Sequence, residues 1–261
     1  MITFITKNKY LKGAVSAAVL LSLWWLAAVL VAEPIILPTP ADVLVKLCSL
    51  AATADFWASV LLSMLRVLGG YLLGVVLGVL LAVAAAKSNW LNALISPIIS
   101  IVTATPVTSF IMLAYFWFKS DNSLTVFICA LMVMPIIFGN VCKGYQQLDN
   151  QLLEVGRVFG FGLFKRARYI IIPGVMPFAV SGAVTSLALA WKAGIAAEIL
   201  CQPIRSIGLY IYDAKVYLQT DSMFAWTAVV IVLSMLLRRL LNLIGGRLLS
   251  RYNFGGDADV G

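Results

Sequence analysis

The chain has 261 residues, of which 62% are hydrophobic and 11% are charged, and its mean hydropathy is +1.00. A soluble domain has about 25% charged residues, so the surplus of apolar side chains indicates an integral membrane protein. The net charge of +8 comes from basic residues at the ends of apolar blocks rather than on one stripe, which argues against a nucleic-acid partner. The chain has no histidine, and its four cysteines lack metal-ligand spacing, so we expect it to bind neither a metal nor a cofactor.

Six apolar segments are each long enough to cross a bilayer, which takes about 20 residues in a helix. The sequence therefore predicts an all-α protein with six transmembrane helices. In the third segment, Pro97 and Pro106 are expected to break the helix, and Pro135 lies inside the fourth. The first segment is too long for a signal peptide and is predicted to remain as an anchor. The six segments are residues 13–32, 56–86, 90–118, 124–141, 174–200 and 223–244.

The connections differ in character. Residues 40–53 are predicted to form a short helix outside the bilayer, and residues 201–221 a polar loop. With both termini in the cytoplasm, the basic residues gather on the cytoplasmic side, as the positive-inside rule requires. The inside then holds Lys7, Lys9, Lys12, Lys87, Lys143, Arg157, Lys165, Arg166, Arg168, Arg238, Arg239, Arg247 and Arg251. The outside holds Lys46, Lys119, Arg205 and Lys215.

The longest cytoplasmic connection, residues 143–173, is half-amphipathic. Leu152, Val155 and Phe159 recur at the spacing of one helix face, and either Asp149 or Asn150 is expected to cap that helix. Glycines at 160 and 162 are expected to end it in a sharp turn.

A second short helix follows the glycine turn. Its polar face has Lys165, Arg166 and Arg168, its apolar face has Phe164, Ala167 and Ile171, and Pro173 is expected to open the fifth span. Such a basic amphipathic unit suits either the membrane surface or a groove on a soluble partner, and the residues alone leave both open.

The run E-V-G-x3-G-x9-I-x-I-P, from Glu154 to Pro173, resembles the cytoplasmic signature of binding-protein-dependent ABC importer permeases, EAA-x3-G-x9-I-x-LP. Glu154, Gly160, Ile170 and Pro173 match it, whereas Val155, Gly156 and Ile172 depart from it. The stretches LPTPADVL, SMLRVLGGYLLGVVLGVLLA and AAEILCQPIRSIGLYIYDAKVYLQTDSMFAW are similar to the nitrate/sulfonate/taurine branch.

This resemblance implies a type I importer permease fold and a division of the chain. Residues 1–55 would be an N-terminal transmembrane helix with an extracytoplasmic segment, residues 56–252 the permease domain with its coupling segment 143–173, and residues 253–261 a tail. The implied location is the bacterial inner membrane. The implied partners are a second permease, identical or paired, two ATPase subunits and an extracytoplasmic substrate-binding protein.

The resemblance also implies which part of the complex uses ATP. ATP and Mg²⁺ would be bound by the ATPase, because the chain has no GxxxxGK[ST] motif and is not expected to be an enzyme. The ATPase-contacting residues would be Glu154, Val155, Gly156, Arg157, Gly160, Lys165, Arg166, Ile170 and Pro173. For the basic residues, a role only in the positive-inside bias is the alternative.

Charges inside a membrane are costly and often functional. Candidates for the translocation pathway are Arg66, Thr103, Thr105, Pro106, Thr108, Trp191, Lys192 and Glu198. Three structural alternatives stay open. Arg66 could pair with Glu198 between helices, the threonine hydroxyls could bond to carbonyls one turn back, and the glycines at 69, 70, 74 and 78 could serve only close packing.

The expected solute is a small anion of the sulfonate, nitrate or taurine kind, to which Lys192 would contribute a cation. A vitamin or vitamin precursor, such as a riboflavin-like or thiamine-precursor-like compound, is the alternative within the same machinery. An ion-coupled secondary transporter is the alternative class, although Glu198 alone is little support for it. An intramembrane enzyme would need a catalytic cluster that the spans lack.

Overall fold

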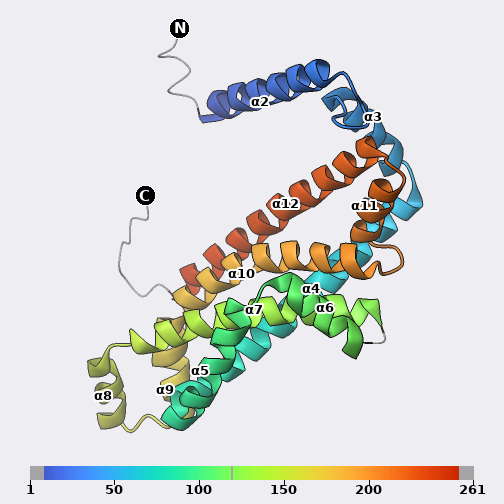
Figure 1. Cartoon of the computed structure of the whole chain (residues 1–261). Coiled ribbons are helices and arrows are strands. Elements are labelled where there is room, and N and C mark those ends of the chain that lie inside the picture. Colours follow the sequence, from blue (N-terminus) through green and yellow to red (C-terminus); the bar gives the residue numbers. More distant parts are fainter. Residues whose placement is uncertain (1–8, 119, 253–261) are drawn as a thin grey trace.

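The computed structural model describes residues 9–118 and 120–252, and within these ranges the regular structure is entirely helical (Figure 1). The predicted all-α class is confirmed for this part of the chain. The helices are α2 (Lys9–Val31), α3 (Pro40–Ala51), α4 (Ala54–Lys87), α5 (Asn89–Ala104), α6 (Val107–Trp117), α7 (Asp121–Gln146), α8 (Asn150–Val158), α9 (Leu163–Arg166), the π-turn η1 (Ala167–Ile171), α10 (Ile172–Cys201), α11 (Ile207–Val216) and α12 (Thr220–Tyr252).

Four helices are long and apolar enough to span a membrane: α4, α7, the continuous α9–η1–α10 run and α12. The bent pair α5 and α6 would make a fifth span if it counts as one. The described part of α2 counts only as a shorter apolar helix over Val15–Val31, so six spans are not confirmed. The expected tail, residues 253–261, and Lys7 and Lys119 lie outside the described residues.

The core of the bundle is α4 packed against α7, with α10 on the same helix α7. Three glycines one turn apart on α4 allow this contact. A Cβ atom added at Gly74 would lie 2.7 Å from the Ala130 carbonyl oxygen, and one at Gly78 would lie 2.8 Å from Ile137 Cβ, while one at Gly70 would collide with the Val126 carbonyl. The predicted close packing is therefore confirmed at these positions. Gly69 faces open space, with no atom within 4 Å of an added Cβ.

The third apolar segment is broken at one proline and not at the other. Between α5 and α6 the chain bends by 106°, and Thr105 adopts an extended conformation with φ −83° and ψ 132°, as a residue before Pro106 should. Pro97, by contrast, lies inside α5, and the expectation that it breaks the helix is wrong. A proline removes one helical hydrogen bond, which a membrane helix tolerates when its neighbouring bonds persist.

The predicted short helix after the first apolar segment is confirmed as α3. It begins with a capping box, in which Thr39 Oγ1 accepts a hydrogen bond from the Asp42 backbone N–H while the Asp42 carboxylate accepts one from the Thr39 N–H. Pro40 occupies the first turn, where its missing N–H costs nothing.

Residues 201–221 are not merely a loop, which corrects the sequence prediction. They contain α11, whose first turn is capped by Ser206 Oγ accepting the Leu209 N–H at 3.0 Å. Ile207, Gly208 and Ala214 are buried, and α11 packs on α10 and α12. A short helix held by tertiary contacts has little signal of its own in the sequence.

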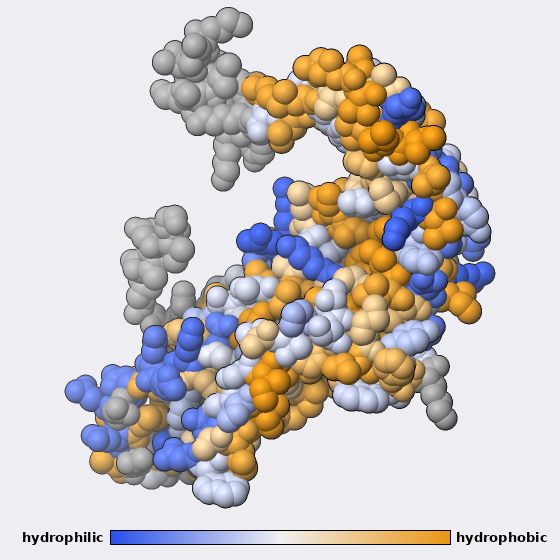
Figure 2. Space-filling view, viewed as in Figure 1, coloured by the Kyte–Doolittle hydropathy of each residue, from blue (hydrophilic) through white to orange (hydrophobic). Residues whose placement is uncertain are grey.

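The two ends of the bundle are occupied by different elements (Figure 1). The hairpin of α8 and α9 projects at one end, whereas α3 and α11 lie at the other. Helix α2 extends away from the bundle, and it reaches α12 where Trp24 stacks on Phe224 with ring centroids 5.7 Å apart. In the space-filling view the visible face of α2 is almost continuously apolar, while the α8–α9 end mixes apolar and hydrophilic atoms (Figure 2).

Candidate functional site

The α8–α9 hairpin follows directly from the end of α7. Asp149 caps α8, because its Oδ1 accepts the Gln151 backbone N–H at 2.8 Å. This decides between the two predicted caps in favour of Asp149. The base of the hairpin also packs on the start of α10, since a Cβ atom added at Gly174 would collide with the Leu148 side chain.

The turn between α8 and α9 depends on one of the two glycines. Gly160 has φ +66°, the left-handed conformation that favours glycine, and the Phe161 N–H donates to the Gly156 carbonyl at 2.8 Å. Together they form a Schellman-type helix end. Gly162 has an ordinary φ of −63°, so the turn does not use its conformational freedom.

The two halves of the motif from Glu154 to Pro173 touch across this hairpin. A Cβ atom at Gly156 would lie 2.9 Å from Ile170 Cδ1, so glycine at this position lets Ile170 approach α8 closely. Phe161 and Tyr169 also meet, with ring centroids 6.4 Å apart. The spacing between the glycine and isoleucine positions of the motif therefore corresponds to a packing contact.

Pro173 lies in the first turn of α10, as predicted, but no break precedes it. Helix α9 continues through the π-turn η1 into α10. A π-turn at this point lets the chain stay helical up to a residue that has no N–H. The hairpin is therefore joined to the fifth predicted span by continuous helix.

The outer surface of the hairpin is unusually apolar for a part that leaves the bundle. Five large apolar side chains here are between 63% and 88% exposed: Val158, Phe159, Leu163, Phe164 and Tyr169. Glu154, Lys165 and Arg168 are exposed beside them. Arg166 is half-buried, and its Nε atom has no hydrogen-bond partner among the described residues. The side chain of Arg157 lies outside the described part.

A second polar site lies at the opposite end of the bundle, around Arg66 of α4. Its Nη1 lies 3.1 Å from Glu198 Oε1 of α10, and its Nε donates to Asn122 Oδ1 of α7 at 2.7 Å. Ser63 Oγ donates to Glu198 Oε2 at 2.7 Å. The predicted pairing of Arg66 with Glu198 is thus confirmed. We call Ser63, Arg66, Asn122 and Glu198 the polar cluster.

The other intramembrane candidates are separated from one another. Trp191 is buried and its indole N–H donates to the Val230 carbonyl at 3.0 Å, so it packs α10 on α12. Lys192 is exposed, and forms no salt bridge with the described part of the chain. Thr103 and Thr105 each donate to the carbonyl one turn back, at 2.8 Å, which confirms the local alternative for both. Pro106 and Thr108 are exposed at the bend.

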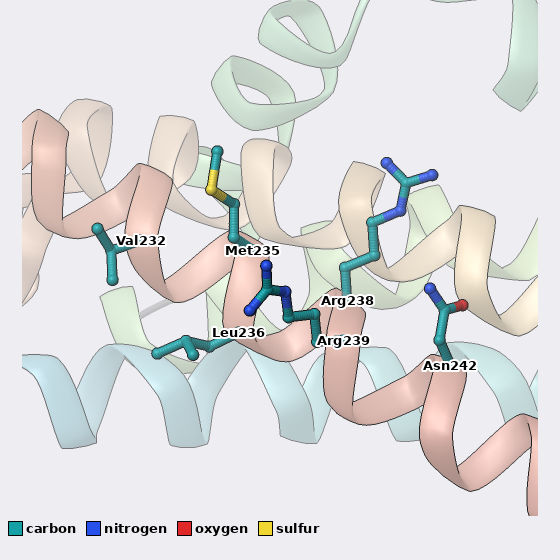
Figure 3. A pocket seen from close by; sticks show the side chains of 6 residues that line it. All are labelled: Val232, Met235, Leu236, Arg238, Arg239 and Asn242. Carbon is teal, nitrogen blue, oxygen red and sulfur yellow. The ribbon is translucent and has the colours of Figure 1, made fainter. Parts of the chain in front are cut away.

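A hollow on the surface of α12 does not gather these residues. It has a volume of about 510 Å³ and is lined only by α12 residues: Val232, Met235, Leu236, Arg238, Arg239 and Asn242 (Figure 3). Figure 3 shows Arg238 and Asn242 side by side, one turn apart on the helix. Because one helix supplies all the walls, this hollow is an open surface groove rather than a solute cavity.

Residues 74–250, more than half of the chain, match the family model of the binding-protein-dependent transport system inner membrane component. The chain belongs to this family. It is therefore the permease of an ABC importer, and it is the membrane component rather than the enzyme, since ATP is bound and hydrolysed by a separate subunit.

Several relatives of this permease are named for the transport of small solutes. SsuC of Escherichia coli, which is named for aliphatic sulfonates transport, is 32% identical over 216 residues, covering 83% of this chain and 80% of the relative. The taurine transport system permease protein TauC of E. coli is 25% identical, covering 88% and 86%. The riboflavin transport system permease protein RibX of Chloroflexus aurantiacus is 27% identical, covering 91% and 88%.

Solved structures support the fold of the permease. An amino acid ABC transporter matches with a TM-score of 0.60 at 15% identity, over 80% of this chain and 96% of that one. The methionine transporter MetNI, in an inward-facing conformation, matches with a TM-score of 0.54 at 17% identity, over 76% and 94%. The predicted type I importer fold is confirmed at the level of the fold.

The sequence patterns did not identify several residues of the two sites. Ser63 and Asn122 of the polar cluster are ordinary polar residues near span ends, although Ser63 precedes Arg66 by three positions and shares its helix face. Leu163 and Val158 of the hairpin were absent from the predicted contacts. Their position beside the glycine turn would have indicated exposure.

Proposed function

We propose that the α8–α9 hairpin is the surface to which the ATPase subunit of the importer binds. The observation that carries this proposal is the exposed apolar surface of the hairpin, which includes Phe159, Leu163 and Phe164 and is surrounded by charged side chains. A surface of this kind fits a groove on a protein partner, with the apolar side chains as anchors. Membership of a family whose transport depends on partner subunits favours the groove over the membrane surface.

Within this surface we assign roles to the residues of the motif. Glu154, Val155, Lys165 and the partly unpaired Arg166 contact the ATPase, and Arg157 is included as a polar contact from its sequence position. Gly156, Gly160, Ile170 and Pro173 shape the hairpin instead of making the contact, because they form its turn, its internal packing and its junction with α10.

The test is a pull-down of the C-terminally tagged chain from its host's membranes, with co-purifying proteins identified by mass spectrometry. We expect an ATPase subunit with the parent chain and its loss with Glu154→Lys and Leu163→Asp. Leu218→Asp is the matched control, because Leu218 is also exposed but follows α11, a helix at the opposite end of the bundle (Figure 1). Retention of the ATPase by Leu163→Asp, or its loss from the control as well, would refute the assignment.

We further propose that the solute is a small anion of the sulfonate or taurine type. Relatives named for taurine and aliphatic sulfonates align along most of the chain. Lys192 supports this choice, because it lies within the α10 span and is exposed. An exposed cation in a span costs about 2.5–3.5 kcal/mol when it faces lipid, so this face of α10 suits a water-filled path covered by a second permease.

Other exposed polar residues extend the proposed path. Ser181 and Thr185 lie on the same face of α10 as Lys192, at helical spacings. Thr103, Thr105, Pro106 and Thr108 would contribute from the bend between α5 and α6. Arg66, Trp191 and Glu198 are buried in the single chain and would join the path only after a rearrangement of the helices.

The experiment for the solute is growth of a deletion strain on single sulfur or nitrogen sources. We expect lost growth on taurine or an alkanesulfonate and its recovery with the parent gene and with Lys192→Arg, but poor recovery with Lys192→Gln. Loss of riboflavin uptake alone would instead favour the vitamin alternative. One relative is named for riboflavin transport, which is the reason to test it. Uptake that persists without the ATPase but requires an ion gradient would favour a secondary transporter.

The proposed topology has six spans, both termini in the cytoplasm and a permease domain over residues 56–252. Helix α2 has 23 residues, which is about 35 Å of helix and enough to cross a bilayer. Two copies of the chain would form the complete pathway, with a substrate-binding protein on the outside. Fusions of alkaline phosphatase after residues 36 and 252 test this arrangement, and we expect activity only with the first.

A further inference from the structure

The connection between α10 and α11, residues 202–206, has an unusual backbone. Gln202 and Arg205 both have φ of +53°, a conformation that costs energy for residues with a side chain. Pro203 lies between them and restricts its own φ. A loop that keeps two such residues within four positions has a shape fixed by its surroundings.

The polar cluster provides that fixation. Arg66 Nη2 donates to the Ile204 carbonyl at 3.0 Å and Nη1 to the Arg205 carbonyl at 3.4 Å. On the far side of the loop, the Gly208 N–H donates to Glu198 Oε2 at 3.3 Å. The Ile207 N–H donates to Ser63 Oγ at 3.0 Å. The backbone on both sides of the loop is therefore bonded to a buried ion pair.

Two side chains of this fixed loop are exposed, and that of Gln202 is half-buried. Pro203 and Ser206 are buried, whereas Ile204 is 82% exposed and the side chain of Arg205 is 59% exposed. Arg205 Nη2 lies 3.7 Å from Asp55 Oδ1, and both groups of this pair are exposed, so the pair is weak. A guanidinium has five donors, and this contact leaves most of them available to a partner.

We propose that Ile204 and Arg205 are a docking contact for the extracytoplasmic substrate-binding protein, which presents a carboxylate beside an apolar recess. The inference rests on the proposed topology, which puts residues 202–206 outside, and it adds a named contact to the proposed function. The family description requires such a protein. Arginine is enriched among the anchor residues of protein interfaces, and the exposed Ile204 beside it offers apolar area that a partner would bury. Lipid headgroups are met by mobile, snorkelling cations and need no fixed loop.

The experiment uses the complete importer in nanodiscs: this chain, the ATPase that co-purifies with it and the binding protein of the same host. ATP hydrolysis is measured against binding-protein concentration. We expect Arg205→Glu and Ile204→Asp to raise the concentration for half-maximal stimulation at least tenfold, with basal ATP hydrolysis unchanged. Lys215→Glu, an equal charge reversal at an exposed position of α11, should change it less than twofold.

Equal effects of Lys215→Glu and Arg205→Glu would overturn the proposal, because they would indicate general electrostatics. An unchanged titration for Ile204→Asp and Arg205→Glu would also overturn it. If basal ATP hydrolysis is absent in every preparation, including the parent complex, the result would count instead against the proposal that the ATPase binds the α8–α9 hairpin.

The side of the membrane is tested separately with Ile204→Cys in a Cys48→Ser background, since Cys48 is the exposed native thiol. Labelling by an impermeant maleimide in right-side-out vesicles supports the proposal. Labelling only in inside-out vesicles places the loop in the cytoplasm and refutes both the topology and the docking contact.

Discussion

The polar cluster leads to the most quantitative prediction, in which Arg66 is replaced by methionine. The side chain of Arg66 is 9% exposed and that of Glu198 is fully buried. Removal of the guanidinium leaves the carboxylate with the Ser63 hydroxyl and the Gly208 N–H as its only donors among residues 9–118 and 120–252. Breaking a buried ion pair from one side costs about 3–5 kcal/mol, because the remaining charge stays buried without compensation.

For a chain of this length, 1 kcal/mol corresponds to roughly 2–4 °C in Tm, so Arg66→Met should lower the apparent Tm by about 6–20 °C. The assay is the loss of the monodisperse peak of a fluorescent fusion after heating in detergent. Arg239→Met is the matched control: Arg239 is an exposed arginine on α12, and its removal should stay within about 0.5 kcal/mol.

A double variant separates the ion pair from the loss of a large side chain. Arg66→Met combined with Glu198→Gln removes both charges together. We expect its destabilisation to be about 2 kcal/mol smaller than the sum of the two single variants, as for residues in direct contact. A Tm for Arg66→Met within 2 °C of the parent, or strict additivity in the double variant, would refute the reasoning.

Three further predictions follow from local geometry. Gly74→Leu should destabilise the chain by about 1–3 kcal/mol or more, because an added Cβ already lies 2.7 Å from a carbonyl of α7, whereas Gly69→Leu should be nearly neutral in the same thermal assay. Gly160→Ala should weaken ATPase binding about tenfold, since φ there is +66° and costs about 1–2 kcal/mol, and an equal effect of Gly162→Ala would contradict this. Thr39→Ala should remove the α3 cap and cost about 1 kcal/mol, measured as a lower Tm, and an unchanged Tm would show that the cap contributes nothing.

The sequence predicted the long helices well, because their apolar length is a property of each segment alone. The short α11 was missed since its stability comes from its packing on α10 and α12, which buries Ile207 and Ala214 and which no local pattern encodes. The two prolines of the third segment read alike in the sequence. Only Pro106 has an extended residue before it, and the surrounding packing decides this.

The candidate sites were predictable to different degrees. The motif from Glu154 to Pro173 marked the hairpin, and composition alone indicated that Arg66 and Glu198 needed partners. The sequence did not show that Arg66 also binds two backbone carbonyls, because that contact depends on a loop more than 130 positions away. It also did not show that Gly156 receives Ile170, since their contact exists only once the chain has turned at Gly160.

The glycine contact between α4 and α7 has a mechanical consequence. Backbone lies against backbone at Gly70, Gly74 and Gly78, so the two helices have little freedom to slide or separate and behave as one stiff rod. Helix α7 has 26 residues, about 39 Å, and it leads at its C-terminal end into the α8–α9 hairpin. Its N-terminal end carries Asn122, which is bonded to Arg66.

A displacement of the hairpin would therefore reach the far end of the bundle as a tilt of this rod. A tilt of about 5° over that length moves the opposite end by roughly 3 Å, comparable to one hydrogen-bond length. The hydrogen bonds from Arg66 to the carbonyls of residues 204 and 205 lie at this opposite end. A small tilt of the rod is therefore enough to make or break them.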